Sequence, residues 1–83
     1  MPDHRVSIRA ELYGERLRRE ANRQGVSARD LAARIGVTES AVSRWFAGSR
    51  EIGDDHRIAV AQALGVPVLA IFPIMTAAGE LVA

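Results

Sequence analysis

The fold of this chain is decided by residues 28–47, which read ARDLAARIGVTESAVSRWFA. Apolar side chains recur there at helical spacing, first at Leu31, Ala32 and Ile35 and then at Ala41, Val42, Trp45 and Phe46. Gly36 separates the two groups, and a glycine at a turn can adopt the left-handed backbone that a Cβ would oppose. The stretch therefore predicts two short helices joined by a tight turn.

Both predicted helices carry start and stop signals. Ser27 and Asp30 have the spacing of a capping box, although the Asp side chain is shorter than the preferred Glu. Thr38 is a suitable N-cap for the second helix, Glu39 favours the positive end of its dipole, and Gly48 ends it. A helix pair of this form can read DNA, with its first helix across the backbone and its second in the major groove.

Before the pair, an apolar stripe predicts a long helix from about Ser7 to Arg23. Gly14 lies inside it and costs about 1 kcal/mol relative to Ala. The alternative is therefore a helix that begins near Gly14, with residues 1–13 as a lead-in. Gly25 is a suitable left-handed stop. The stripe expected to face the core consists of Ile8, Leu12, Leu17 and Ala21.

After the pair, a fourth helix is expected to run from a cap at Asp54 or Asp55 to about Leu64. Its inward residues should be Ile58, Ala61 and Leu64. A short fifth helix is expected over Pro67 to Phe72, with the proline in its first turn. Residues 73–83 leave three alternatives open: a hairpin, a partner-binding strand or a frayed tail. The expected fold class is all-α with five helices.

The charge of the chain is concentrated in its middle. The formal net charge is only +1, but residues 16–50 carry eight arginines against three acids. Residues 1–15 and 51–83 are both net acidic. A basic block between acidic flanks suits contact with a phosphate backbone, and the alternative is a set of solvated helix faces.

Composition argues against several classes of function. Eighty-three residues predict one domain, and the lack of cysteine excludes disulfides and thiolate metal sites. The sequence shows no signal peptide or membrane helix, so a cytoplasmic protein is expected. His4 and His56 have no ligand pattern near them, and Asp54-Asp55 is better explained as a helix cap than as a catalytic pair. We therefore expect no enzyme, no metal and no cofactor.

The helix pair and its surroundings resemble the Cro/CI-type repressor (XRE-like) helix-turn-helix family. The matching stretches are Gly25–Ser27, Leu31–Thr38, Ala41–Trp45 and Gly48–Arg50, followed by Ile58-Ala59, Ala63–Val66, Leu69 and Phe72. The resemblance covers about residues 14–73 and implies a Cro/repressor-like DNA-binding domain there. Residues 74–83 would then be a C-terminal tail, and the protein would be of bacterial or phage origin.

The resemblance also implies which residues meet DNA. Those expected at base edges are Thr38, Glu39, Ser40, Ser43 and Arg44, and those expected at phosphates are Ser27, Ala28, Arg29, Ser49 and Arg50. Arg44 is the first candidate for a base contact because Arg pairs bidentately with guanine O6 and N7. Glu39 either accepts from cytosine N4 or only favours the helix dipole. The arginines before the pair, Arg16, Arg18, Arg19 and Arg23, contact phosphate or belong to a solvated face.

Two departures from the family pattern concern the second helix of the pair. Many members place a Glu after its aromatic residue and an Arg on the first helix to pair with it, where this chain has Phe46 and Ala21. An apolar pair can replace a buried ion pair at little cost in stability. Ala47 stands where the family often has a polar or basic residue, so a phosphate contact is expected to be missing there.

These features predict a sequence-specific regulator of transcription that binds double-stranded DNA. It is expected to act as a repressor, as a homodimer on an inverted-repeat operator. The segment Val68 to Val82 is the expected dimer contact because it is apolar and otherwise unexplained. The alternative is an antitoxin that regulates its own operon and binds a protein toxin through residues 73–83. No contact with a membrane is expected.

Overall fold

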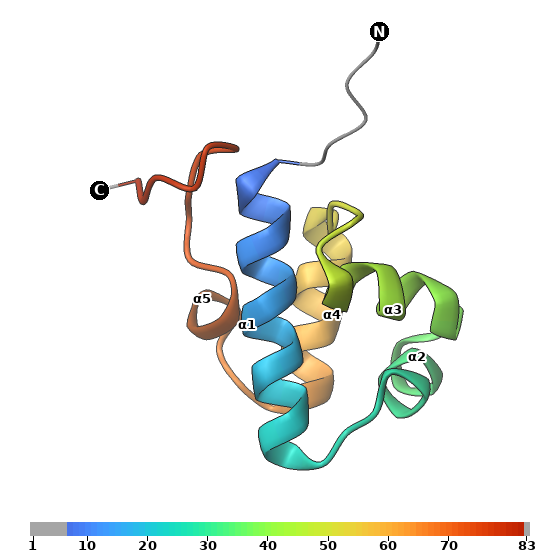
Figure 1. The fold of residues 1–83 in the computed structure, drawn as a ribbon. Helices are drawn as coiled ribbons and strands as arrows, with labels where there is room; N and C mark the ends of the chain where they lie inside the picture. Colours follow the sequence, from blue (N-terminus) through green and yellow to red (C-terminus); the bar gives the residue numbers. More distant parts are fainter. Residues whose placement is uncertain (1–6, 83) are drawn as a thin grey trace, which may run out of the picture.

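The computed structural model describes residues 7–82, and this part of the chain folds into five helices, as Figure 1 shows. Their bounds are α1 Ile8–Gln24, α2 Ala28–Ile35, α3 Glu39–Ala47, α4 Asp54–Leu64 and α5 Val68–Ile71. The all-α class is therefore confirmed. No helix in residues 7–82 is both long and apolar enough to cross a membrane.

The long helix α1 organises the others. It contacts α3, α4 and α5, and α2 packs on α3 and α4. In Figure 1, α2 and α3 lie on one side of α1 and α5 lies on the other. The largest fully buried side chains of the core between them are Leu17, Leu31, Val42, Trp45, Ile52 and Val60.

α1 runs unbroken through Gly14, so the alternative of a helix that begins near that residue is wrong. Its N-cap is Ser7, whose hydroxyl accepts a hydrogen bond from the Ala10 amide. Gly14 is needed for packing, because a Cβ there would lie 2.1 Å from the Trp45 carbonyl oxygen and 3.0 Å from the Gly48 nitrogen. The glycine that weakens α1 locally thus allows α3 to cross it at backbone contact.

α4 differs from the sequence expectation at its start and on its buried face. Its N-cap is Gly53, which makes no side-chain cap, and both aspartates fall in the first turn. Ile58 is 49% exposed, while Val60, Ala61 and Leu64 are buried. The buried face is set by the neighbouring helices rather than by the most apolar residues of α4. α5 is also shorter than expected, with Pro67 as its N-cap.

Residues 73–82 form the hairpin alternative, and not a frayed tail. Met75 and Leu81 pair as an antiparallel bridge, and the Val82 amide donates to the Ile74 carbonyl at 3.0 Å. The hairpin docks on the start of α1, where the Arg9 amide donates to the Ala77 carbonyl at 3.1 Å. Ile8 was expected to face the core, but it is 51% exposed and lies beside the hairpin glycine Gly79.

Gly14→Ala tests the crossing of α1 and α3. We expect it to lower the free energy of unfolding by about 1–3 kcal/mol because the new methyl group overpacks the crossing. Helix propensity alone predicts the opposite, a gain of about 1 kcal/mol. Urea unfolding followed by circular dichroism measures the change.

The matched control is Gly53→Ala, since Gly53 has φ −67° and no atom lies within 4 Å of the position that a Cβ would take there. It should cost about 0.5 kcal/mol, the difference between Gly and Ala at an N-cap. A Gly14→Ala protein more stable than the wild type would contradict the packing argument.

Candidate nucleic-acid interface

The turn between α2 and α3 has the geometry that its residues predict. Gly36 has φ +74°, and the amides of Gly36 and Val37 both donate to the Ala32 carbonyl, at 2.9 and 3.1 Å. Ala32 is 3% exposed, so a small side chain lies where the two helices meet. These contacts give α3 a defined angle to α2.

The start of each helix is capped as expected. The capping box of α2 is complete: the Asp30 amide donates to the Ser27 hydroxyl at 3.0 Å, and the Ser27 amide donates to the Asp30 carboxylate at 3.3 Å. The Thr38 hydroxyl accepts from the Ala41 amide at 3.1 Å. With this bond made, the Thr38 side chain keeps one hydroxyl proton to donate to a ligand.

α3 divides into a buried and an exposed face. Val42 and Trp45 are 0% and 2% exposed and anchor the helix in the core. All five residues expected at base edges are exposed, namely Thr38, Glu39, Ser40, Ser43 and Arg44. The exposed face therefore carries three hydroxyls, a carboxylate and a guanidinium. Ala47 also lies at the surface.

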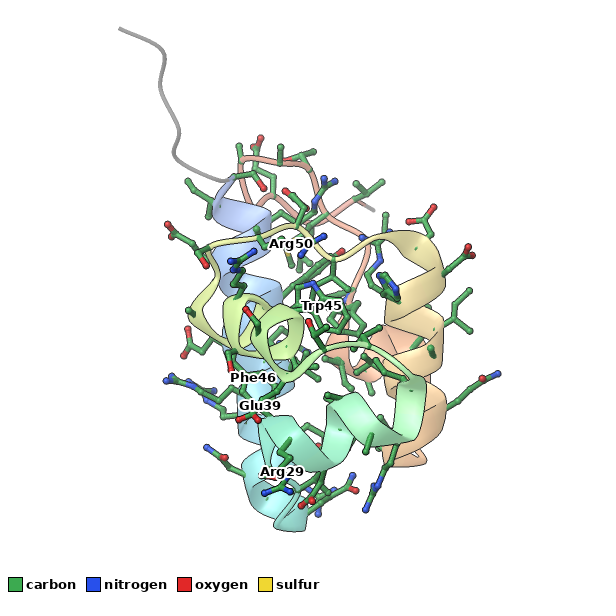
Figure 2. The ribbon with its side chains drawn as sticks, turned by 90° about the vertical axis from the view of Figure 1, so that its right-hand side faces the viewer. Arg29, Glu39, Trp45, Phe46 and Arg50 are labelled. Carbon is green, nitrogen blue, oxygen red and sulfur yellow. The ribbon has the colours of Figure 1, made fainter. Side chains whose placement is uncertain are left out.

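The residues expected at phosphates come from the two ends of the helix pair. Ser27, Arg29, Ser49 and Arg50 are exposed, and Ala28 is half-buried. Figure 2 shows Arg29 at the start of α2, Glu39 at the start of α3 and Arg50 in the loop after α3, one above another. Within residues 7–82, no carboxylate lies within ion-pair distance of Arg29 or Arg50. Both guanidinium groups are thus available to an external anion.

α1 carries five arginines, and four of them have partners within the protein, Arg9 with Glu51 among them. Arg16 donates to the carbonyls of Ile71 and Ala70, at 2.8 and 2.9 Å, and so closes the end of α5. Arg19 pairs with Glu15, and Arg23 pairs with Glu20. Arg18 is exposed and has no such partner among the described residues. The basic block seen in the sequence therefore includes structural arginines.

The Arg23–Glu20 pair also favours the charged form of both side chains. Hydrogen bonds from Arg23 and then from Gln24 lower the pKa of the Glu20 carboxyl, and the same pair raises the pKa of Arg23. Because the pKa of Glu20 is lower in the folded than in the unfolded chain, its ionisation stabilises the fold at pH values above the ordinary Glu pKa. This stabilisation is lost as the pH falls through the folded-state pKa. Gln24 extends the cluster by donating to the Leu64 carbonyl at 2.8 Å.

The apolar departure from the family pattern is accommodated in the core. Ala21 is fully buried, and Phe46 is half-buried and packs against the core. His56 is exposed and lies 5.1 Å from the Trp45 ring, centroid to centroid. His4 lies outside the described residues. Residues 7–82 contain no group of three or more His, Asp or Glu side chains placed to hold a metal ion.

Several contacts at the interface were missed by sequence reasoning. Arg34 of α2 donates to the Ala63 carbonyl of α4 at 3.2 Å. Glu51, in the loop after α3, contacts Ser7 and Arg9 at the start of α1. These partners are 29 to 44 residues apart in the chain. No local pattern in the sequence could have indicated them.

Comparisons with known proteins agree with this geometry. The family model HTH_3, described as Helix-turn-helix, matches residues 16–71. The clp gene regulator ClgR from C. glutamicum is 28% identical over 76% of this chain and 82% of its own, with a TM-score of 0.73. The restriction-modification controller protein C.AhdI from Aeromonas hydrophila is 27% identical over 76% of this chain and 96% of its own, also at 0.73.

A third similar structure is a complex with DNA. The P22 c2 repressor protein, bound to a synthetic operator, is 24% identical over 74% of this chain and 92% of its own, with a TM-score of 0.68. At that identity the likeness concerns the fold alone. A search of curated protein sequences found no match to the chain.

Proposed function

The chain belongs to the HTH_3 helix-turn-helix family of DNA-binding transcription regulators, and from that premise we propose that it represses transcription as a homodimer on an inverted-repeat operator. The observation that carries the proposal is the exposed polar face of α3, held at a fixed angle by the Gly36 turn and the buried Trp45. Occupying an operator needs no further activity from the protein. Its site of action would be the cytoplasm, where bacterial and phage DNA is found.

The exposed face of α3 supplies the sequence readout in this proposal. Arg44 forks onto guanine O6 and N7, and Glu39 accepts from a cytosine N4 amine or serves only the helix dipole. Ser40 and Ser43 add hydroxyl contacts to bases or phosphate. Thr38 contributes the one proton that its cap leaves free.

Contacts to the phosphates of the DNA backbone would come from both ends of the helix pair. The amides of Ala28 and Arg29 have no carbonyl partner among the described residues, and they open the positive end of α2. Ser27 and the Arg29 side chain flank these amides. Arg50 would bind a second phosphate beyond α3, and Ser49 would join it by turning its hydroxyl away from the Arg44 carbonyl. Such contacts strengthen binding without selecting a sequence.

Binding-site selection from a randomised duplex library tests the readout. The wild type should enrich an inverted repeat, and Arg44→Ala should relax one base position in each half-site by about 1–3 kcal/mol of discrimination. Arg19→Ala is the charge-matched control, since Arg19 pairs with Glu15 on α1. It should enrich the same site as the wild type. If the wild type enriches nothing even at low salt, sequence-specific binding is wrong.

The proposed dimer contact is the apolar surface of α4, α5 and the hairpin. Its exposed side chains are Ile58 at 49%, Leu69 at 57%, Ile74 at 61%, Leu81 at 71% and Val82 at 54%. Ile58, Leu69 and Ile74 line one groove, which Val68 and Phe72 continue. Arg9, Asp54 and Arg57 also line the groove, and exposed apolar surface rimmed by polar residues is typical of protein contacts. A second copy of this chain would remove it from water.

Leu69→Glu tests this contact by placing a charge in the groove. We expect sedimentation analysis to find the wild type as a dimer and Leu69→Glu as a folded monomer with weaker DNA binding. Gln62→Glu is the matched control, because Gln62 is exposed on α4 and lies outside that groove. A wild type that stays monomeric both free and on DNA would overturn the dimer.

A point variant tests the role of residues 73–83 more specifically than their truncation does. The carbonyl of Pro73 accepts from the Tyr13 hydroxyl, and that of Ala77 accepts from the Arg9 amide. Removing the tail would therefore disturb α1 as well as any partner. The antitoxin alternative predicts that Leu81→Glu abolishes capture of a toxin while DNA binding persists.

A further inference from the structure

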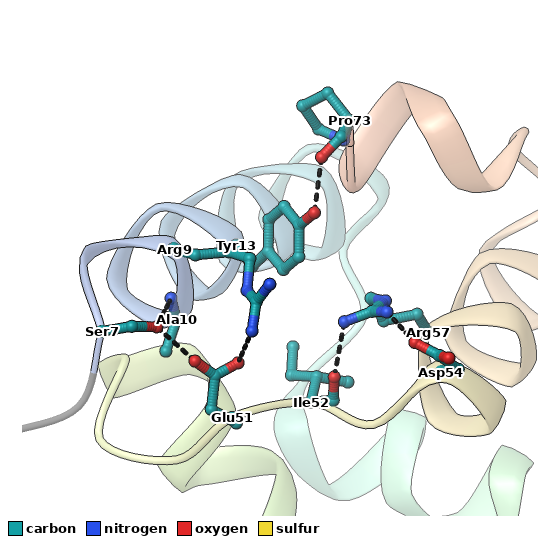
Figure 3. Close-up of polar contacts among 9 residues, drawn as sticks. All are labelled: Ser7, Arg9, Ala10, Tyr13, Glu51, Ile52, Asp54, Arg57 and Pro73. Carbon is teal, nitrogen blue, oxygen red and sulfur yellow. Dashed lines mark hydrogen bonds and ion pairs between the residues drawn. The ribbon is translucent and has the colours of Figure 1, made fainter. Parts of the chain in front are cut away.

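The loop after α3, residues 48–53, is tied to the start of α1 by the side chain of Glu51. The Ser7 hydroxyl donates to one carboxylate oxygen, and Arg9 Nη2 lies 3.4 Å from the other, as Figure 3 shows. The same hydroxyl accepts from the Ala10 amide at 3.2 Å. The Glu51 carboxylate is thus joined directly to the N-cap of α1.

The residues on both sides of Arg50 are held in place. Before it, the amide and hydroxyl of Ser49 donate to the Arg44 carbonyl, at 3.0 and 3.3 Å. After Glu51, the Ile52 side chain is 1% exposed and its carbonyl accepts from Arg57 Nη1 at 2.9 Å (Figure 3). Arg50 itself is exposed and has no carboxylate partner among residues 7–82.

The sign of the Glu51 charge is unexpected at this place. A carboxylate beside a phosphate-contacting arginine repels DNA, and removing it should by electrostatics alone tighten binding. An acid next to a DNA-contacting residue weakens binding unless its structural effect outweighs its repulsion of the phosphates. Its two partners on α1 supply such an effect.

We propose that Glu51 is a positioning residue for DNA binding. By fastening the loop to Ser7 and Arg9, it holds the backbone that carries Arg50, which is exposed just beyond the end of α3. This inference rests on the proposed function, in which Arg50 contacts a phosphate. Glu51 does not touch DNA and acts through its neighbour.

Two substitutions separate positioning from charge. Glu51→Ala removes both contacts to α1, and Glu51→Gln keeps an acceptor for Ser7 while removing the ion pair with Arg9. Positioning predicts weaker binding, by about three- to tenfold for Ala and less for Gln. Charge alone predicts that both variants bind more tightly. Glu15→Gln is the matched control, because it removes one acid from an Arg pair on α1 and should not weaken binding.

The probe is a fluorescein-labelled, mixed-sequence duplex of about 30 base pairs, because phosphate contacts do not depend on sequence. Anisotropy titrations over a range of salt concentrations give the affinity and its salt dependence. Arg50→Ala should weaken binding and reduce the slope of log K against log salt by about 0.9 for each phosphate that the protein no longer neutralises. Thermal unfolding of every variant establishes that it is folded at the temperature of the titration.

The double variant Arg50→Ala/Glu51→Ala identifies the route of the effect. If Glu51 acts through Arg50, Glu51→Ala causes no further loss of affinity in the Arg50→Ala background. Equal reductions in both backgrounds would overturn the inference, as would tighter binding by Glu51→Ala alone. If Arg50→Ala leaves affinity and slope unchanged, the failure lies in the proposed phosphate contact instead.

Discussion

The close approach of α1 and α3 at Gly14 is the constraint on which the rest of the structure depends. A Cβ there would lie 2.1 Å from the Trp45 carbonyl, so the two backbones are in direct contact. Gly48 continues the same crossing, where a Cβ would lie 2.8 Å from the Glu11 Cα. This contact buries Trp45, turns the polar face of α3 outward and brings the following loop to the start of α1. The orientation of the candidate DNA-binding surface is therefore a result of backbone packing.

The start of α1 connects the two surfaces to which a function has been proposed. On one side it receives Glu51 from the loop that carries Arg50. On the other side it receives the hairpin, through the Ala77 carbonyl and through the bond of Tyr13 to Pro73. The Arg57 guanidinium lies 5.5 Å from the Tyr13 ring centroid and donates to the Ile52 carbonyl (Figure 3). Arg57 is therefore a second connection between α1 and the loop after α3. The proposed dimer contact and the proposed DNA contact would thus both be held in place by the start of α1.

Charge counting gave an incomplete description of this protein. Residues 16–50 hold eight arginines, but Arg16 closes the end of α5 and Arg34 binds a carbonyl of α4. Arg guanidinium groups satisfy helix-end carbonyls that would otherwise lack a donor. Arg29 and Arg50, in contrast, have no carboxylate partner in the described part of the chain. Arginines that bind carbonyls of the fold can be told from arginines without such a partner only when their neighbours are known.

The sequence by itself determined the helix pair, its caps and its glycine turn, because these depend on residues within four positions of one another. The capping box at Ser27 and the left-handed Gly36 are of this kind. The tertiary structure alone decided that Ile58 faces outward, that residues 73–82 fold back on α1 and that Glu51 reaches Ser7. Such contacts join residues distant in the chain, and their geometry follows from how the helices pack rather than from any local periodicity.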